Sequence, residues 1–556
     1  MRSEFRPLET AVLVCLALAV TCPAAARNGA GQKRPRAPAN LELPRTDLGE
    51  TEMILRVLDR LAFGPRPGDV DEIRRLGLAR YLDEQLHPEG KPDPEVEARL
   101  KGMESLDLVA WELVGRYPDA GLQRQIAQRQ AALAEQKSPE AQRPASPPQK
   151  PPDSAGPQRI VQELVAAKLV REIYSRWQLN EVLVDFWLNH FNVFIQKGPE
   201  RYLMTEYDRD VSPAMLVYLD NSESVDPTPA RPMMRPRRAY DGSLARFFPR
   251  PGQRPRGLNE NYARELLELH TLGVDGGYTQ KDVTEVARCF TGWTLLQPQQ
   301  GGGSIFVEAN HDRGEKLVLG HRIPAGGGIE DGLEVLEILA RHPATARFLA
   351  TKLARRFVSD EPPEALVRRL ARVYSETDGD IREMVRALVT SPEFFSPRYA
   401  GAKFKRPLEF FVSAVRALGA EVEPHPALAG LLQSLGEPPF ACLPPTGYAD
   451  AATEWLSTNQ LLRRMNTAVM LASGRAPGIT VHLDRLFEGV DSADASALTD
   501  RAASALLGRP LPEAERAEVA ARVGEAAASA APRDGAGALR ALAAALVLGS
   551  PEFQRQ

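Results

Sequence analysis

Three of the eight histidines in this chain stand where an imidazole could do chemistry. At 100° per residue, His190 and His270 each fall on the apolar face of a predicted helix, so both rings should be buried and could meet in the core. His311 is followed directly by Asp312 in a polar turn. Imidazole with carboxylate forms sites for zinc, manganese or non-haem iron, and it also forms acid–base pairs. The sequence therefore indicates one candidate site around these histidines, and its chemistry is either the binding of a divalent metal or proton transfer by an acid–base pair.

Acidic residues on the same helices complete the candidate sets. Glu265 and Glu268 come within two turns before His270. Asp185 lies on the polar side of the helix that carries His190. We expect a catalytic set and a metal set that share the two buried histidines. The catalytic candidates are His190, Glu265, Glu268 and His270, and the metal candidates are His190, His270, His311 and Asp312.

A simpler interpretation is open for each of these residues. A buried histidine normally hydrogen-bonds a backbone carbonyl or a carboxylate and does nothing else. Glu260, Arg264 and Glu268 stand four apart, which is the spacing of an ion ladder on a helix surface. His311 and Asp312 are also ordinary turn residues. The same side chains are thus compatible with a purely structural role.

The motifs of several well-known mechanisms are absent from the sequence. It has no Gly-rich phosphate loop, no GxSxG, no HExxH and no paired CxxC motif. The formal charge of −4 shows no basic excess, so nucleic acid is not expected as a partner. The sequence therefore does not favour nucleotide binding or the common hydrolase mechanisms.

Helices must position the candidate residues, and the stretch from Leu258 to Trp293 shows how. Asn259 can cap an α-helix that runs to Thr271. In this helix His270 lies within the apolar arc, whereas Thr271 falls on the opposite, polar face. A second helix should open at Thr279, which has an acidic residue three positions later.

The fold class indicated by this pattern is all-α, a multi-helical bundle with peripheral repeated units and one small β-hairpin near 304–320. In the hairpin, SIFVE and KLVLG flank a polar turn. A chain of 556 residues is too long for one hydrophobic core. We expect a signal peptide at 1–26, a disordered tether at 27–50, an N-terminal helical unit at 51–133, a Pro-rich disordered insertion at 134–159, a helical core domain at 160–395 and a C-terminal helical region at 396–556.

Two stretches of the sequence repeat each other. Residues 362–394 and 511–553 both run Pro-Glu-Ala, helix, Asp-Gly, helix, Ser-Pro-Glu-Phe. Such a unit has one apolar side and is stable only when it docks on its neighbours. The string RLAFGPRPGDVDEIRRL near the N-terminus is a third, partial copy.

The N-terminus predicts export. Arg2 and Arg6 precede an apolar run at 11–20, and small residues follow up to Ala26, which is the pattern of a secretory signal peptide. Lipid attachment at Cys22 is an alternative. No second long apolar run occurs, so the mature chain should have no transmembrane span and should be periplasmic or extracellular.

Two cysteines, Cys289 and Cys442, lie outside the signal region. An exported protein permits a disulfide between them. Two buried free thiols are the other interpretation. The sequence leaves both open.

Several strings together resemble the bacterial family called domain of unknown function 1800. They include VDFWLNHFNVF, SPAMLVYLDNSES, ENYARELLELHTLGVDGGYTQKDVTEVARCFTGW and TDGDIREMVRALVTSPEF, and the resemblance runs from Thr51 to the C-terminus. It implies an exported, mostly helical protein whose gene often lies beside one for a sulfatase-like exported protein. It implies no established activity and no catalytic residues. The C-terminal repeat also resembles the module called domain of unknown function 4214.

One departure from the family pattern concerns a possible pocket. Relatives usually carry an extra segment with a histidine and a helix between a YDRDV-like string and PAMLVYLDN. Here Val211 runs directly into Ser212. If that helix closes a pocket in relatives, the pocket of this protein is altered or open.

Two functions from different classes are compatible with the sequence. The first is an exported structural or binding protein of the cell envelope, acting with the sulfatase-like protein or with a polysaccharide. The second is a metal- or carboxylate-dependent hydrolase with a His/Glu site in the helical core. Repeated helical modules and the missing motifs favour the first, and the clustering of histidines and acids favours the second.

Overall fold

The computed structural model describes most of the chain that follows the expected leader. The predicted signal peptide, most of the tether and most of the Pro-rich insertion lie outside the described residues, and so does the junction at 208–211. Of the helices that are described, none is long and apolar enough to cross a membrane. The described residues are 41–88, 93–119, 124, 156–207, 212–226, 257–295, 303–529 and 535–556.

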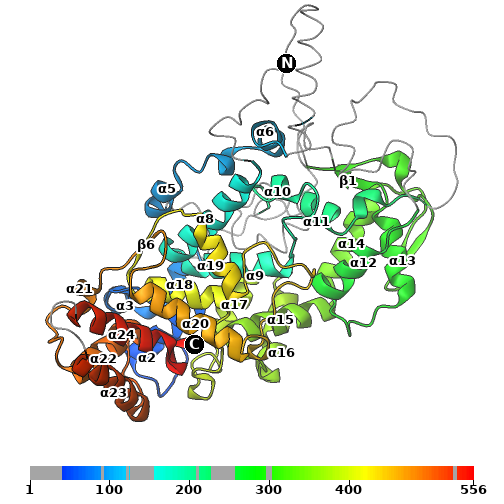
Figure 1. Cartoon of the computed structure of the whole chain (residues 1–556). Helices are drawn as coiled ribbons and strands as arrows, with labels where there is room; N and C mark the ends of the chain where they lie inside the picture. The colour runs from blue at the N-terminus through cyan, green and yellow to red at the C-terminus, as the bar shows by residue number, and fades with distance from the viewer. Residues whose placement is uncertain are drawn as a thin grey trace, which may run out of the picture.

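The chain folds into a helical assembly in which the first described helices lie beside helices from the C-terminal part of the chain (Figure 1). Helices α2 (Glu50–Leu61) and α3 (Asp69–Leu76) lie beside α22 (Ala495–Leu507). The approach is close, because a Cβ atom on Gly508 would meet Leu55 at 2.7 Å. The expected fold class, mostly helical with small strands, is confirmed.

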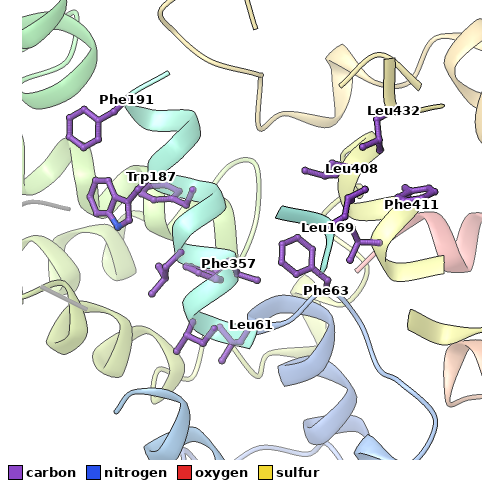
Figure 2. Packing of buried hydrophobic residues seen from close by; sticks show 14 of the residues in the cluster. Leu61, Phe63, Leu169, Trp187, Phe191, Phe357, Leu408, Phe411 and Leu432 are labelled. Atoms are coloured by element: carbon purple, nitrogen blue, oxygen red, sulfur yellow. The ribbon is translucent and has the colours of Figure 1, made fainter. Parts of the chain in front are cut away.

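Helices α8 (Gln158–Tyr174) and α9 (Gln178–His190) form the centre of the assembly. Apolar residues dominate both helices, and such helices belong in a core. Figure 2 shows Trp187 of α9 and Leu169 of α8 among the buried apolar side chains. The side of α9 that carries Asp185 is buried as well, so its charge must meet partners inside the protein.

The repeat seen in the sequence is also a repeat in the structure. In both copies the serine of Ser-Pro-Glu-Phe caps a turn, because Ser391 Oγ accepts from Phe394 N and Ser550 Oγ accepts from Phe553 N, each at 3.3 Å. Both phenylalanines are buried. The first copy is built by α15 (Pro343–Phe357), α16 (Glu364–Glu376) and α17 (Ile381–Val389), and the second by α22, α23 (Glu513–Ser529) and α24 (Gly535–Gly549).

The strands pair differently from the predicted hairpin. SIF and KLV do not pair with each other, because each has another antiparallel partner. Leu319 and Gly320 have positive φ values of 49° and 82°, so they form the tight two-residue turn of a separate hairpin. The pairs are β1 (Trp293–Leu295) with β2 (Ser304–Phe306), β3 (Lys316–Val318) with β4 (His321–Ile323), and β5 (Glu421–Val422) with β6 (Ile479–Thr480).

Apolar contacts run across the predicted units. One cluster of buried apolar residues extends from Leu41 to Phe553, and the boundaries between units stay a prediction. The other α-helices are α4 (Leu78–Gln85), α5 (Pro94–Leu100), α6 (Ala110–Arg116), α10 (Glu200–Leu203), α11 (Ser212–Tyr218), α12 (Asn261–Glu265), α13 (Gln280–Cys289), α14 (Ile329–Arg341), α18 (Pro407–Ala417), α19 (Ala427–Leu435), α20 (Thr458–Ala472), α21 (Leu483–Leu486) and α25 (Pro551–Gln554). Short 3-10 turns are η1 (Glu104–Asp107), η2 (Asn221–Glu223), η5 (Glu308–Asn310), η6 (Pro397–Tyr399) and η7 (Ala452–Glu454).

Cys289 and Cys442 are buried free thiols. Burial raises the pKa of Cys289 to about 12 and the pKa of Cys442 to about 11. Neither is therefore a reactive thiolate at neutral pH.

Candidate functional site

The helix that carries His270 changes its geometry just before that residue. The predicted α-helix stops at Glu265, where α12 ends, and a π-helix spans Leu266–Thr271. In keeping with the wider turn, Leu272 N donates to Leu267 O, five residues back, at 2.9 Å. Such π-turns are rare and often stand at functional sites.

The π-turn corrects the predicted direction of Thr271. The projection at 100° per residue placed Thr271 on the polar face, but the residue is only 2% exposed. Its hydroxyl donates to Leu266 O at 2.7 Å, again five residues back. Because a π-turn holds more residues than an α-turn, the residues after it point elsewhere than an α-helix predicts. His270 stays buried, as predicted.

His190 and His270 meet, and each ring bonds the other residue's backbone. His190 Nε2 lies 3.1 Å from the carbonyl oxygen of His270, and His270 Nδ1 lies 3.0 Å from that of His190. A carbonyl oxygen only accepts, so both nitrogens donate. Because α9 ends at His190, this carbonyl would otherwise lack an intrahelical partner. The pair thus caps α9 and fastens it to the π-helix.

The other ring nitrogen of each histidine does not bond a backbone carbonyl. His190 Nδ1 faces the Nζ of Lys352 at 3.0 Å, and His270 Nε2 is buried without a hydrogen-bond partner among the described residues. Burial and the nearby Lys352 lower the pKa of His270 to about 3 and hold that of His190 well below its usual value, so both rings are neutral. This geometry favours hydrogen bonding over ligation, since a lysine competes for one of the two free nitrogens. Metal binding stays a prediction.

The two predicted glutamates are not bonded to this pair. Glu265 is half-buried, and its burial together with the charge of Glu268 raises its pKa. Glu268 accepts from the hydroxyl of Tyr278 at 3.3 Å. Glu260 and Arg264 form a partly exposed ion pair at 3.5 Å, as the surface-ladder interpretation expects. Within the described residues, no hydrogen bond or ion pair joins either predicted glutamate to the histidines.

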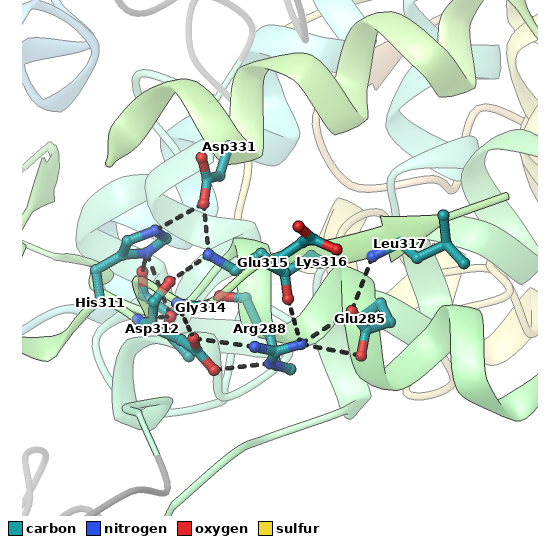
Figure 3. A network of polar contacts seen from close by, with 10 residues as sticks. Glu285, Arg288, His311, Asp312, Gly314, Glu315, Lys316, Leu317 and Asp331 are labelled. Atoms are coloured by element: carbon teal, nitrogen blue, oxygen red, sulfur yellow. Dashed lines mark hydrogen bonds and ion pairs between the residues drawn. The ribbon is translucent and has the colours of Figure 1, made fainter. Parts of the chain in front are cut away.

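His311 and Asp312 lie in a separate buried network (Figure 3). His311 Nδ1 donates to Thr291 O at 2.8 Å, and its Nε2 lies 3.1 Å from a carboxylate oxygen of Asp331. Asp312 accepts two bonds from Arg288, at 2.7 and 3.2 Å. Burial alone would raise the pKa of Asp312, but the Arg288 bonds lower it.

This network fastens the β3–β4 hairpin to two helices. Lys316 of β3 is 1% exposed and pairs with Asp331 of α14. Arg288 of α13 also bonds Glu285 at 2.9 Å and the carbonyl of Glu315 at 3.1 Å. In the part of the chain that the structure describes, no group of three or more His, Cys, Asp or Glu side chains could hold a metal ion. The four predicted metal candidates fall into two separate places, His190 with His270 and His311 with Asp312.

A further polar site, of which the sequence analysis named only Asp185, lies on the opposite side of α9 from His190, so Asp185 does not join the histidine pair. Lys168 Nζ is 2.8 Å from Asp185 and 2.7 Å from Glu172. Arg406 bridges Asp185 and Glu437, with 3.0 Å to the latter. All five side chains are nearly or fully buried. Buried charges require such partners, so the site is held together by ion pairs.

The surroundings shift the pKa values of two acids of this site, Glu437 and Asp185, in opposite directions. Burial raises the pKa of Glu437 to about 7, so this carboxyl group can exchange a proton near neutrality. Burial acts to raise the pKa of Asp185 too, but Lys168 and Arg406 hold it below its usual range. The adjoining cavity has a volume of about 30 Å³, which suits one or two water molecules but no larger substrate. In the sequence this site is indicated only by charged residues within apolar runs, such as Lys168 in VAAKLV.

An asparagine holds the loop that closes this small cavity. Asn189 exchanges two hydrogen bonds with the backbone of Tyr448, at 2.8 and 2.7 Å. Gly447 beside it has φ +73°, and a Cβ there would lie 2.3 Å from Asn189 O. Only glycine fits this contact without strain.

A hollow much larger than the cavity beside Asp185 lies where α2 and α3 approach α21 and α22. It has a volume of about 880 Å³ and is lined by parts of α2, α3, α21, α22 and the segment between α2 and α3. We call it the arginine groove, because the guanidinium groups that line it outnumber its acids. Its basic lining residues are Arg66, Arg74, His482, Arg485 and Arg501.

The acids of the arginine groove already have partners. Asp69 lies 3.2 Å from Arg416, and Asp71 lies 2.6 Å from Arg74. In contrast, Arg501 Nε donates to the carbonyl of Leu486 at 2.6 Å, which orients the guanidinium without neutralising it. A groove of this kind attracts acidic groups of a ligand.

A scan against protein-family models places this architecture in a known family. Residues 56–555 match the family described as protein of unknown function, DUF1800. The match covers nearly the whole chain, so the protein belongs to the DUF1800 family, and the resemblance predicted from the sequence is confirmed. Neither the search of curated proteins nor the search of solved structures found a match.

Proposed function

We propose that the protein is an exported binding protein of the cell envelope and that it holds an acidic polysaccharide in the arginine groove. The observation that carries this proposal is the groove itself. Its volume of about 880 Å³ is typical of ligand sites, whereas the cavity beside Asp185 is far smaller. The expected signal peptide at 1–26 supports export to the periplasm or beyond.

The charge of the groove selects the ligand class. Arg485 is exposed and makes no ion pair with the described residues, and Arg501 bonds a carbonyl rather than a carboxylate. A planar guanidinium group pairs well with carboxylate and related oxyanions. Sulfate or uronate groups along a glycan would thus meet two arginines from neighbouring helices. An acidic face of the sulfatase-like protein is the other occupant to be tested.

Calorimetric titration of the mature protein with sulfated oligosaccharides tests the proposal. The double variant Arg485→Gln/Arg501→Gln should lose about 1–2 kcal/mol, or about five- to thirtyfold in affinity, since partly exposed charge pairs contribute modestly. Higher salt should weaken binding as well. The desulfated oligosaccharide should bind more weakly than the sulfated one.

A matched control uses two exposed arginines remote from the groove. Arg313 and Arg322 pair with Glu308 and Glu315 on the hairpin side of the molecule. The variant Arg313→Gln/Arg322→Gln changes the net charge by the same amount and should keep its affinity. Equal losses in both double variants, or no binding by the unmodified protein, would contradict the proposal. Binding of the purified sulfatase-like protein, but of no glycan, would identify the other occupant.

A further inference from the structure

The buried ion-pair network beside α9 contains more acids than bases. Within the described residues, direct ion pairs join four acids to three bases, and each of these side chains is at most 10% exposed. A buried charge without a counter-charge is costly, so the network is most stable when one acid is protonated. The acids are Glu172, Asp185, Glu409 and Glu437, and the bases are Lys168, Arg356 and Arg406.

Glu437 is placed to hold this proton. Asp185 has two bases of its own, Lys168 at 2.8 Å and Arg406, whereas Glu437 has only the Arg406 that it shares with Asp185. Burial raises the pKa of Glu437 to about 7, the charge of Arg406 opposes this effect, and Asp185 adds to it. Glu437 also lines the small cavity, so its proton can exchange through a water molecule there.

The other ionisable groups around Glu437 do not titrate near pH 7. Burial acts to raise the pKa of Glu409, but the neighbouring guanidinium groups lower it. Burial raises the pKa of Cys442 to about 11 and raises that of Tyr448 as well, so both are neutral. Arg464 of α20 acts on Glu437 from farther away and stays charged, because its pKa of about 10 is still above neutrality.

The loop from Glu437 to Tyr448, which we call the cavity loop, has a strained backbone. Phe440 has a φ of +60°, in a left-handed region that a bulky side chain rarely adopts. Hydrogen bonds from α9 and the segment after it hold the loop, because Ile195 N donates to Phe440 O at 3.0 Å and Asn189 accepts from Tyr448 N at 2.7 Å. Strained residues of this kind gather in segments that switch between two states.

We propose that Glu437 is a proton-operated latch, which holds the cavity loop closed when it is protonated and loosens the loop when it is ionised. Loss of the proton to water places a second negative charge beside Asp185, and the two carboxylates then share the single Arg406. Opening of the loop relieves this repulsion by moving Glu437 into water. The latch does not rest on the arginine groove, with which the small cavity shares no lining residue.

Opening of the cavity loop should become easier as the pH rises from about 4.5 to about 7. The pKa of Glu437 is about 7 in the closed loop and 4.5 in water. Between these pH values the closed loop binds more protons than the open one, so a rise in pH favours opening, and above pH 7 the effect levels off. One such group changes the opening constant by at most about tenfold per pH unit.

Hydrogen exchange of the unmodified protein at pH 5.5 and at pH 7.5, followed by peptide mass spectrometry, tests this proposal. After correction for the intrinsic exchange rate, protection of the peptides that contain Ile195 and Tyr448 should be about tenfold lower at pH 7.5. Helix α16, which contributes no residue to the network, serves as the internal reference. Equal protection at both pH values would overturn the proposal, and so would an equal loss in α16, because the whole protein would then be loosening.

Variants locate the proton. Glu437→Gln has a neutral side chain of the same shape and should keep the two peptides protected at pH 7.5. The matched control Glu454→Gln, at an exposed glutamate, should lose protection as the unmodified protein does. Burial raises the pKa of Glu172 too, so Glu172→Gln is the rival variant. A pH effect that persists in Glu437→Gln and disappears in Glu172→Gln would contradict the latch at Glu437. If Glu437→Gln does not fold, the pH effect in the unmodified protein and in Glu172→Gln still decides.

Discussion

Replacement of His270 tests whether the histidine pair is a hydrogen-bonded lock between helices. In His270→Ala the carbonyl of His190 loses its donor, and an unsatisfied buried acceptor costs about 1–3 kcal/mol. Loss of the ring also leaves a void beside Phe191, whose ring centre is 5.2 Å away. Truncation of a large buried side chain costs about 2–5 kcal/mol. We therefore expect the free energy of unfolding to fall by about 3–5 kcal/mol, since the two terms overlap.

His270→Asn separates the lock from a ligand site. The amide nitrogen of asparagine can take the place of Nδ1 and keep donating to His190, but nothing replaces Nε2. This variant should recover about 1–2 kcal/mol of the loss, the usual contribution of one hydrogen bond. Urea unfolding followed by tryptophan fluorescence measures it, because Trp187 lies 5.3 Å from the His190 ring. Metal analysis of the same samples checks ligation. Equal destabilisation by both variants, or loss of a stoichiometric metal from both, would refute the lock.

Three more predictions concern pH and packing. The pKa of His270 is about 3 in the folded protein and 6.5 in the unfolded chain. Between these pH values the unfolded chain therefore binds more protons than the folded protein. The free energy of unfolding should for this reason fall as the pH drops from 6.5 toward 3. This single group changes the free energy of unfolding by at most about 1.4 kcal/mol per pH unit, and the change should be smaller in His270→Asn. Urea unfolding of both proteins at pH 7 and at pH 5 measures the difference. Asp331→Asn leaves Lys316 buried without its counter-ion and should cost about 3–5 kcal/mol in thermal unfolding, whereas an unchanged midpoint would speak against the network. Gly447→Ala forces a Cβ against Asn189 and should lower the free energy of unfolding by about 1–3 kcal/mol in the same assay. An unchanged free energy of unfolding would contradict the close contact between Gly447 and Asn189.

The sequence predicted the features that depend on local periodicity. His190 and His270 each lie on the apolar face of a strongly patterned helix, which predicts that both are buried and allows them to meet. The repeat ending in Ser-Pro-Glu-Phe was also visible, since both its capping serine and its buried phenylalanine are local features. The simpler interpretation, a bond from each ring to a carbonyl, matches the hydrogen bonds of the pair.

Other features depend on contacts that periodicity does not encode. Nothing in LLELHT marks a π-turn, so Thr271 was placed on the wrong face. The β3–β4 turn uses Leu319 at positive φ, which a leucine rarely adopts, so the hairpin was expected elsewhere. Lys168 and Glu437 are far apart in the chain, and only the packing of α8 against α18 and α19 brings their charges to one cavity.

Hydrogen exchange of the mature protein with and without a sulfated oligosaccharide tests the central claim most directly. If the arginine groove holds the ligand, amide protection should rise in 65–71 and around Arg485 and Arg501, which line the groove from opposite sides in the sequence. The hairpin at 316–323 should not change and serves as the internal reference. Protection confined to the hairpin side, or spread evenly over exposed arginines, would contradict binding in the groove.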